Sequence, residues 1–383
     1  MTVKNKMEEW KEYKLGDVIT IKYGKDHKQI ADGDIPIYGS GGIMRYGDRY
    51  IYEGPSILIP RKGSLNNIMF TNKPFWTVDT MFWTIINEEV ANPLFVYYSI
   101  CKKDFACLNV GSAVPSLTVP VIEDIDILLP SKVTQNRIVA FLKSLDDKIE
   151  NNKRINDNLE KQAQTLFKSW FVDFEPFKDQ PFEESELGMI PKGWRVGMLS
   201  EIANITMGSS PSGSSYNTDG KGEVFYQGRA EFGFRFPKRN MYTTKAIKFA
   251  EINSVLLSVR APVGDINLAE ERCCIGRGLS SIQSKDNKNS FVLYLTKNLK
   301  PQFEQFNGEG TVFGCINKRA LEGMAILIPD EKTINKFEFI SSCIDKEIKT
   351  FELESRRLAQ LRDLLLPKLM SGELKVNDVE KNL

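Results

Sequence analysis

The sequence predicts an α+β protein: two mixed α/β domains at opposite ends of an antiparallel two-helix coiled coil, related by an internal pseudo-two-fold repeat. Two observations predict this arrangement. Residues 131–171 contain no Pro or Gly and carry a sustained heptad seam of mainly apolar residues. The same pattern returns at 330–370, and each copy follows a β-rich segment. Two long helices in one chain can therefore bury one another.

The apolar seam of the first helix advances in steps of four and three residues from Ile138 to Trp170. A helix of about 40 residues is ~60 Å long, which is more than one globular domain can bury along its whole length. The predicted seam residues are Ile138, Leu142, Leu145, Ile149, Asn152, Leu159 and Leu166 in the first helix, and Phe337, Ile344, Ile348, Phe351, Leu358 and Leu365 in the second.

Three polar residues, Asn152, Asn156 and Ser355, interrupt the middle of the seam. Polar residues at such positions fix the register and the pairing of two helices, and they lower stability. The alternative is a polar break in an ordinary helix bundle. An antiparallel pairing would bring Phe337 of one helix close to Trp170 of the other.

The globular segments repeat as well. Trp10–Gly24 matches Trp194–Gly208, with the tryptophan and the closing glycine in common. Gly111–Phe171 aligns without gaps to Gly310–Met370, with eleven identities in sixty-one positions. In both copies a strand-like run ends in Pro and the long helix follows at once. The chain is therefore predicted to be a tandem duplication.

The predicted organisation has five parts. Each globular half contains short β-rich runs bounded by Gly, Pro and Asn turns, and one short helix, at 92–102 or 289–300. The acidic, Pro-rich linker is expected to hold no regular structure, and Pro367 is expected to stop the second long helix. The boundaries are 1–130 for the first domain, 131–171 for the central helix, 172–189 for the linker, 190–329 for the second domain, and 330–383 for the C-terminal helix and tail.

Composition is that of an ordinary soluble protein, with 42% hydrophobic and 26% charged residues. No apolar run of 18 residues occurs and the N-terminus is charged, so we expect neither a membrane span nor a signal peptide. The six cysteines show no CxxC spacing. They are expected to be buried thiols in a reducing cytoplasm, with no metal site.

The net charge of +1 is unevenly distributed along the chain. Residues 190–329 contain 18 Lys and Arg against 12 Asp and Glu. This excess suggests a surface that binds a polyanion, although an ordinary lysine-rich surface explains it equally well.

The sequence contains no recognisable catalytic motif. The single histidine, His27, has no nucleophile in a recognisable arrangement, and no P-loop, GxGxxG or HExxH occurs. We therefore expect a non-catalytic chain that binds no cofactor.

Polar, Gly-flanked loops in both halves carry the residue types that contact DNA. Arg, Lys and Asn read base edges, whereas Ser, Lys and backbone amides hold phosphates. Nearby aromatic residues either support these loops or stack on a base. The candidates are Lys22, Lys25, His27, Lys28, Ser40, Arg45, Arg61, Lys62 and Asn66 in the first half, and Ser210, Ser212, Arg229, Arg235, Lys238, Arg260, Asn267 and Arg277 in the second.

The chain resembles, over essentially its whole length, the specificity subunits of type I restriction-modification systems. Five segments carry the resemblance. They are ILIPRKGSLN (57–66), NRIVAFLKSLDDKIENNKRINDNLEKQAQTLFKSWFVDF (136–174), LSVRAPVGDINLA (257–269), CIGRGLSSI (274–282) and LRDLLLPKLMSGEL (361–374). Where the first half has PRKGS the second has VRAPVG, a difference that fits two halves reading different sequences.

The resemblance implies two target recognition domains, each of which reads one half of a bipartite, asymmetric sequence in double-stranded DNA. The helices would set the gap between the half-sites. They would also dock two modification (methyltransferase) subunits and two restriction and translocase subunits in the cytoplasm. AdoMet, ATP and Mg would then be bound by those partners and not by this chain. The alternatives to this interpretation are a non-enzymatic coiled-coil adaptor for protein partners, and part of a single-chain restriction or modification enzyme.

Overall fold

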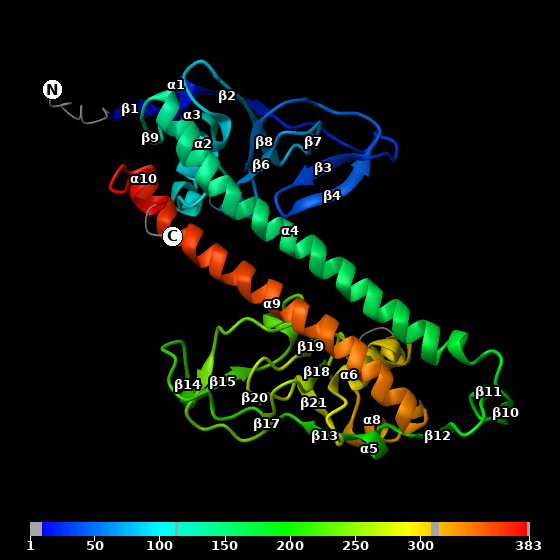
Figure 1. The fold of residues 1–383 in the computed structure, drawn as a ribbon. Coiled ribbons are helices and arrows are strands. Elements are labelled where there is room, and N and C mark those ends of the chain that lie inside the picture. Colours follow the sequence, from blue (N-terminus) through cyan, green and yellow to red (C-terminus); the bar gives the residue numbers. More distant parts are fainter. Residues whose placement is uncertain (1–9, 112–113, 308–313, 381–383) are drawn as a thin grey trace, which may run out of the picture. The chain divides into compact units, whose positions relative to one another are not determined.

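The computed structural model describes residues 10–111, 114–307 and 314–380 (Figure 1). Gly310, where the second copy of the longer repeat begins, lies outside these ranges. The chain divides into two compact units, one formed by 1–150 with 355–383 and the other by 151–354. We call them unit 1 and unit 2. The two predicted long helices are present as α4 (Lys132–Phe171) and α9 (Glu331–Met370), each of 40 residues. Each helix contributes one half to each unit.

Unit 1 is built on an antiparallel four-stranded sheet with the order β2-β8-β5-β6. Its centre is the run SILIP of β5, which is buried along its whole length. The strands of this sheet are β2 (Ile19–Tyr23), β5 (Ser56–Pro60), β6 (Met69–Thr71) and β8 (Met81–Ile86). A second sheet has the order β4-β3-β7, with β3 (Ile35–Gly39), β4 (Gly42–Gly47) and β7 (Trp76–Thr77). A ribbon pairs β1 (Lys11–Lys14) with β9 (Asp126–Leu129).

Short helices complete unit 1. The predicted helix at 92–102 is α2 (Pro93–Ile100), which begins at Asn92 because the Asn92 side chain accepts hydrogen bonds from the amides of Leu94 and Phe95. Proline at the first helical position favours the same start. The others are α1 (Leu15–Val18), η1 (Phe105–Leu108), α3 (Val119–Glu123) and α10 (Val376–Glu380).

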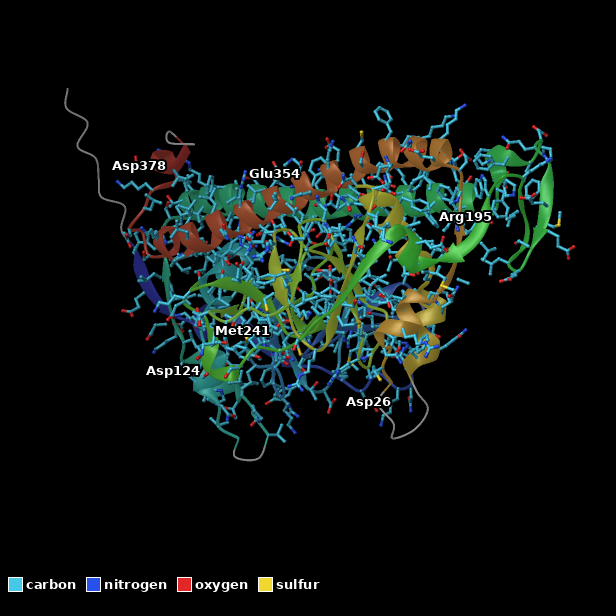
Figure 2. All side chains as sticks on the ribbon, turned by 90° about the horizontal axis from the view of Figure 1, so that it is seen from below. Asp26, Asp124, Arg195, Met241, Glu354 and Asp378 are labelled. Atoms are coloured by element: carbon cyan, nitrogen blue, oxygen red, sulfur yellow. The ribbon has the colours of Figure 1, made fainter. Side chains whose placement is uncertain are left out.

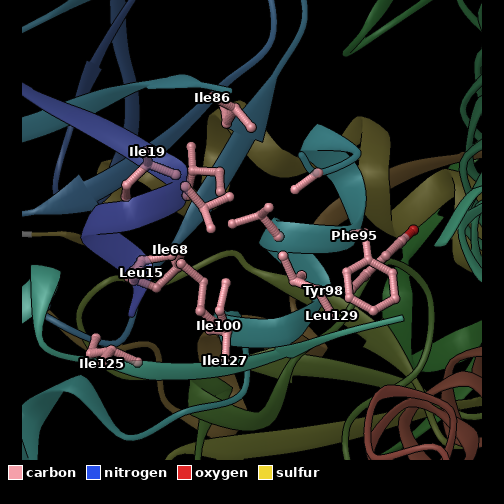
Figure 3. Packing of buried hydrophobic residues seen from close by; sticks show 14 of the residues in the cluster. Leu15, Ile19, Ile68, Ile86, Phe95, Tyr98, Ile100, Ile125, Ile127 and Leu129 are labelled. Carbon is pink, nitrogen blue, oxygen red and sulfur yellow. The ribbon is translucent and has the colours of Figure 1, made fainter. Parts of the chain in front are cut away.

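The core of unit 1 includes parts of both long helices. Figure 3 shows the packing of strand and helix residues such as Leu15, Ile19, Phe95 and Ile127. Further residues of this core come from the start of α4 and the end of α9, namely Ile138, Val139, Leu142, Leu365, Leu366 and Leu369. The coiled-coil seam therefore runs directly into the core of the globular half.

Unit 2 repeats this plan with a larger second sheet. Its main sheet has the order β13-β21-β18-β19, with β13 (Ala203–Met207), β18 (Val255–Ser258), β19 (Ile266–Leu268) and β21 (Leu279–Ser284). The second sheet has the order β14-β16-β15-β20-β17, with β14 (Tyr216–Asn217), β15 (Glu223–Tyr226), β16 (Tyr242–Thr243), β17 (Phe249–Ala250) and β20 (Cys273–Ile275). The ribbon pairs β12 (Arg195–Met198) with β22 (Ala325–Ile328).

The helices of unit 2 also follow the repeat. The predicted helix at 289–300 is present as α6 (Asn289–Asn298). Both second sheets contain one parallel pair at the same place, β3 with β7 in unit 1 and β15 with β20 in unit 2. The predicted internal duplication is therefore confirmed by strand order. The remaining elements are α5 (Leu199–Ile202), η3 (Gly213–Ser215), η4 (Arg229–Glu231), α7 (Lys300–Glu304), η5 (Gln305–Asn307) and α8 (Lys318–Glu322).

Within each unit the halves of α4 and α9 pack antiparallel. In unit 2 the centroid of the Phe337 ring lies 5.6 Å from the ring centroid of Phe167, 5.1 Å from that of Phe171 and 6.1 Å from that of Trp170. Near its end α4 buries Phe167 and Phe171 more deeply than Leu166 and Trp170, because a 3.6-residue helix drifts from a strict heptad. Buried seam residues are Ile138, Leu142, Leu145, Asn152, Phe337, Ile348 and Leu365, and half-buried ones are Ile149, Leu159, Leu166, Ile344, Phe351 and Leu358.

Two predictions about the ends of the long helices are wrong. Pro367 does not stop α9, which continues to Met370 because Leu366 and Leu369 pack in the core of unit 1. The chain turns away just after Met370, at Gly372, whose φ of +76° is typical of the residue that follows a helix C-terminus.

The linker 172–189 does hold regular structure. It contains η2 (Glu175–Phe177) and most of a hairpin of β10 (Phe182–Ser185) and β11 (Gly188–Pro191). The ring of Phe177 is buried and lies 4.9 Å from the ring of Trp194. The aromatic residues of the linker therefore anchor it to unit 2 despite the linker's acidic composition.

The cysteines are all free thiols, but the prediction that all are buried is wrong. Cys273 and Cys274 are buried and Cys101 is half-buried, whereas Cys107, Cys315 and Cys343 are exposed. The exposed thiols of Cys107 and Cys343 still donate hydrogen bonds, to Asp104 Oδ2 and to the carbonyl of Phe339. The number and spacing of the cysteines in the sequence do not show which thiols are buried and which are exposed.

A polar joint links each globular half to the long helices. In unit 1 the hydroxyl of Tyr98 on α2 donates to Asp146 Oδ2 of α4 at 2.5 Å, and Arg362 of α9 donates to Asp146 Oδ1 at 2.6 Å. In unit 2 the hydroxyl of Tyr294 on α6 donates to Asp345 Oδ1 of α9 at 2.7 Å. Asp146 and Asp345 are the same position of the sequence repeat. The duplication has therefore kept one tyrosine–aspartate contact in each unit.

In unit 2 the arginine of the joint is Arg235, which comes from the loop after η4. It is only 2% exposed. Its guanidinium donates to Asp345 Oδ1 at 2.7 Å, to the hydroxyl of Tyr294 at 3.1 Å, and to Glu160 of α4. Lys297 of α6 also pairs with Glu160. Burial alone raises the pKa of the Glu160 carboxyl, but Arg235 and Lys297 outweigh it and hold that pKa below its ordinary value.

Two predicted DNA contacts are therefore wrong. Arg235 cannot reach a ligand on the surface, because it neutralises two carboxylates of the long helices. Asn267 is also 2% exposed, and its side chain accepts from the amide of Gly233 and donates to the carbonyl of Gly233. Both side chains hold the loop around residue 235 in place.

The polar seam residues are incompletely satisfied. Asn152 Nδ2 donates to Glu354 Oε2 at 2.6 Å, and Asn156 Nδ2 donates to the carbonyl of Ile348 at 3.2 Å. Figure 2 labels Glu354 on α9. The Oδ1 atoms of both asparagines are buried without a hydrogen-bond partner. Such groups lower stability.

Replacing Arg235 with methionine is expected to lower the free energy of unfolding by about 3–5 kcal/mol, because Asp345 is left without a cation and Glu160 retains only Lys297. Chemical denaturation at neutral pH measures this change. Lys238→Met is the control, since Lys238 lies in the same loop with its side chain exposed, and it is expected to change stability by less than about 1 kcal/mol. Equal effects of the two substitutions would contradict the assigned role.

Replacing Asn156 with leucine is expected to raise the free energy of unfolding by roughly 1 kcal/mol, because it removes an unpaired buried oxygen and adds apolar contact. Asn151→Leu on the exposed face of α4 is the matched control and is expected to have little effect. Denaturant unfolding of the full chain gives both values. If Asn156→Leu instead lowers the free energy of unfolding by about 1 kcal/mol or more, the hydrogen bond from Asn156 Nδ2 stabilises the protein by more than the unpaired Oδ1 destabilises it.

Candidate nucleic-acid interface

The basic loops of each half meet at one edge of the main sheet. In unit 1, β2 and β5 both pair antiparallel with β8, so the ends of β2 and β5 lie at the edge where β8 begins. In unit 2, β13 and β18 have the same relation to β21. We call this the strand-end edge. It consists of residues 23–25, 60–63 and 78–80 in unit 1, and of 207–210, 258–261 and 276–278 in unit 2.

The backbone of this edge is the same in both units. The amide of Gly24 donates to Met81 O at 2.9 Å, and that of Gly208 donates to Leu279 O at 2.9 Å. A Cβ on Gly24 would lie 2.0 Å from Val78 O, and one on Gly208 would lie 2.1 Å from Gly276 O. The glycine that closes the Trp–Gly repeat in the sequence is therefore required by close backbone approach.

Exposed cations project from the strand-end edge of unit 1. Lys25 and Lys62 are exposed, as is Lys22 at the end of β2. Arg61 is half-buried, and its guanidinium carbon lies 5.8 Å from the centre of the Tyr23 ring, which is itself 55% exposed. Cations and an exposed aromatic ring together suit contact with phosphates and bases.

Unit 2 presents a similar edge. Arg260 and Arg277 are exposed. Arg260 occupies the position of Lys62, because the two residues form the equivalent isolated bridges, Lys62 with Ser116 and Arg260 with Cys315. Ser210 Oγ accepts from the amide of Arg277 at 3.2 Å and donates to Gln227 Oε1 at 3.0 Å. Ser210 therefore fixes the loop. Its partner Gln227 is exposed on the same edge and is not among the residues predicted from the sequence.

The remaining unit 1 candidates mostly brace loops. Arg45 donates from Nη2 to the carbonyls of His27 and Ile30, at 2.7 Å each. Asn66 donates to Asp104 Oδ1 at 3.0 Å and accepts from the amide of Ala106 at 2.9 Å. Lys28 is exposed, and His27 and Ser40 are half-buried.

The remaining unit 2 candidates lie on loops around the second sheet. Ser212 Oγ lies 2.9 Å from Ser214 Oγ, and Arg229 pairs with Asp265. Lys238 is exposed, and its amide donates to the carbonyl of Glu231 at 2.7 Å. The structure thus brings Ser210, Arg260 and Arg277 to one edge.

Among residues 10–111, 114–307 and 314–380, no group of three or more His, Cys, Asp and Glu side chains could hold a metal ion. Within those same ranges, no helix is both long and apolar enough to cross a membrane.

Comparison with known proteins places both halves in one family. The model of the type I restriction modification DNA specificity domain matches twice, at residues 7–161 and 191–363. The putative type I restriction enzyme MjaX specificity subunit of Methanocaldococcus jannaschii is 35% identical over 262 residues, which cover 67% of this chain and 60% of that relative. The MjaIX specificity subunit of the same organism is 26% identical, with 97% and 95% covered.

A solved structure shares the fold. The S subunit of the type I restriction-modification system from M. genitalium matches with a TM-score of 0.61 and 16% sequence identity, covering 97% of this chain and 98% of that one. Two matches to the domain model, one for each half of the duplication, account for most of the sequence. The chain therefore belongs to the family of type I restriction-modification specificity subunits.

Proposed function

We propose that this chain gives a type I restriction-modification complex its DNA sequence specificity by binding a bipartite, asymmetric target, with one half-site for each globular half. One observation carries the proposal: the strand-end edge occurs twice, with the same backbone and different side chains. A repeated backbone suits docking on the same feature of duplex DNA twice. Different side chains suit two different half-site sequences.

The proposed gap between half-sites depends on the helices. Each half is bound to α4 and α9 through its core and its polar joint, so a coiled coil about 40 residues long would act as a spacer between two readers. A spacer longer than one ~34 Å turn of DNA would let both halves occupy the major groove on one face of the duplex. The length of the helices would then set the number of base pairs between the half-sites.

Catalysis is assigned to partner subunits. Two methyltransferase subunits would supply AdoMet and the pocket for a flipped adenine, and two restriction subunits would supply ATP-driven translocation and Mg-dependent cleavage. Exposed apolar residues on the long helices are candidates for docking, including Val133 and Leu364 in unit 1 and Phe339 in unit 2. Exposed apolar side chains of this size suit a protein partner. The complex would act in the cytoplasm.

Exchange of residues 190–329 for the equivalent segment of a relative is expected to change one half-site and to leave the other half-site and the gap unchanged. The chimeric chain is assembled with the methyltransferase subunits, and methylated adenines are mapped by long-read sequencing. A complex without the specificity chain is the control and is expected to methylate no defined sequence. The proposal fails if both half-sites change or if neither does.

A further inference from the structure

The turn that leads into β8 in unit 1 and into β21 in unit 2 has one backbone structure. The amide of Val78 donates to Tyr38 O at 3.0 Å, and the amide of Gly276 donates to Tyr226 O at 2.8 Å. A hydrogen bond of 3.0 Å closes each turn. In unit 1 the amide of Met81 donates to the carbonyl of Val78, and in unit 2 the amide of Leu279 donates to the carbonyl of Gly276. Asp79 and Arg277 therefore occupy the same position at the tip of the two turns.

Both tip side chains are exposed and free for a ligand. In the part of the chain that the structure describes, neither the carboxylate of Asp79 nor the guanidinium of Arg277 has a hydrogen bond or an ion pair. Their neighbours differ in this respect, since Arg229 pairs with Asp265 and Arg239 with Glu271. An unpaired charge on the strand-end edge is available for an intermolecular contact.

The backbone below Arg277 is held rigidly. Its amide donates to Ser210 Oγ at 3.2 Å. The glycines on either side pack against Gln227, because a Cβ on Gly276 would lie 2.9 Å from Gln227 Cα and one on Gly278 would lie 2.7 Å from Gln227 O. A fixed backbone lowers the entropy lost when the side chain binds, and it sets the direction of approach.

The opposite charges of the two tip residues decide between phosphate and base. A phosphate contact needs a cation, so equivalent positions that both faced phosphate would not carry Asp in one half and Arg in the other. Base edges differ from sequence to sequence. Arg pairs in a bidentate manner with N7 and O6 of guanine, and a carboxylate accepts from the amino group N4 of cytosine.

We propose that the tip residue of this turn reads one base in the major groove of each half-site, Arg277 a guanine and Asp79 a cytosine. The assignment rests on the proposed function and gives it a residue-level basis. Lys62 and Arg260, which are basic in both halves, are then the phosphate contacts of the same edge. The two halves share the contact that positions them and differ in the contact that specifies sequence.

Arg277→Lys separates the two roles, because lysine keeps the charge and loses the bidentate fork. With the full complex, the preference for one guanine of the methylated motif is expected to weaken in Arg277→Lys, because lysine still donates to N7 and O6. It is expected to fall roughly 5- to 150-fold in Arg277→Ala, as for the loss of a bidentate pair worth about 1–3 kcal/mol. The rest of the motif is expected to remain. Arg260→Ala is the comparison, and it should weaken methylation of all sites alike.

Asp79→Asn tests the first half. The amide is nearly isosteric, but it removes the charge and replaces one acceptor oxygen with a donor, a pattern that pairs with adenine. One cytosine in the other half-site is therefore expected to lose its preference in favour of adenine, while the Arg277 half-site is unaffected. A chemical probe complements it. Replacing the assigned guanine by 7-deazaguanine is expected to weaken binding by the wild-type complex and to have no further effect on the Arg277→Ala complex.

The outcomes distinguish this assignment from the proposed function. A wild-type bipartite motif that keeps all its specified bases in Arg277→Lys, Arg277→Ala and Asp79→Asn would overturn the assignment alone. A uniform loss of methylation in Arg277→Ala, with Arg277→Lys unchanged, would make Arg277 a phosphate contact. A wild-type complex that methylates no bipartite motif would overturn both proposals. Both side chains are exposed, so unchanged thermal midpoints are expected and serve as the folding control.

Discussion

The antiparallel packing of α4 against α9 is the interaction on which both units depend. In unit 1 the start of α4 and the end of α9 form one side of the core, through Leu142 and Leu369 among others. In unit 2 Phe171 and Phe337 do the same. Neither globular half buries its core without both helices, because the strands alone leave that side open. The core of each globular half is therefore completed by residues of both α4 and α9.

The polar joints show how a duplicated protein keeps geometry while its sequence diverges. The tyrosine–aspartate contact is present in both units, as Tyr98 with Asp146 and Tyr294 with Asp345. The arginine that completes it comes from α9 in unit 1 and from a loop of the globular half in unit 2. What is retained is a cation beside a half-buried carboxylate, since an unneutralised carboxylate there is strongly unfavourable.

Local patterns predicted the parts of the fold that depend on local spacing. The long helices followed from apolar residues at heptad spacing, and the duplication followed from matching turns and prolines. Arg235 was misassigned because its partners, Glu160 and Asp345, are 75 and 110 residues away in sequence, and an arginine in a loop looks the same with or without them. The equivalence of Asp79 and Arg277 was also hidden in the sequence, because only the strand pairing of each unit shows that their turns correspond. Of the candidate interface, the exposed cations at strand ends were identifiable and the bracing residues were not.

The claim that the helices set the distance between two DNA readers is tested most directly by changing their length. Seven residues inserted between Glu150 and Asn151 and seven between Glu354 and Ser355 would lengthen the helix pair by one heptad, ~10 Å. Mapping of methylated adenines is then expected to show the same two half-sites separated by about three more base pairs, at ~3.4 Å each. An unchanged gap with full methylation, or altered half-sites, would contradict the account.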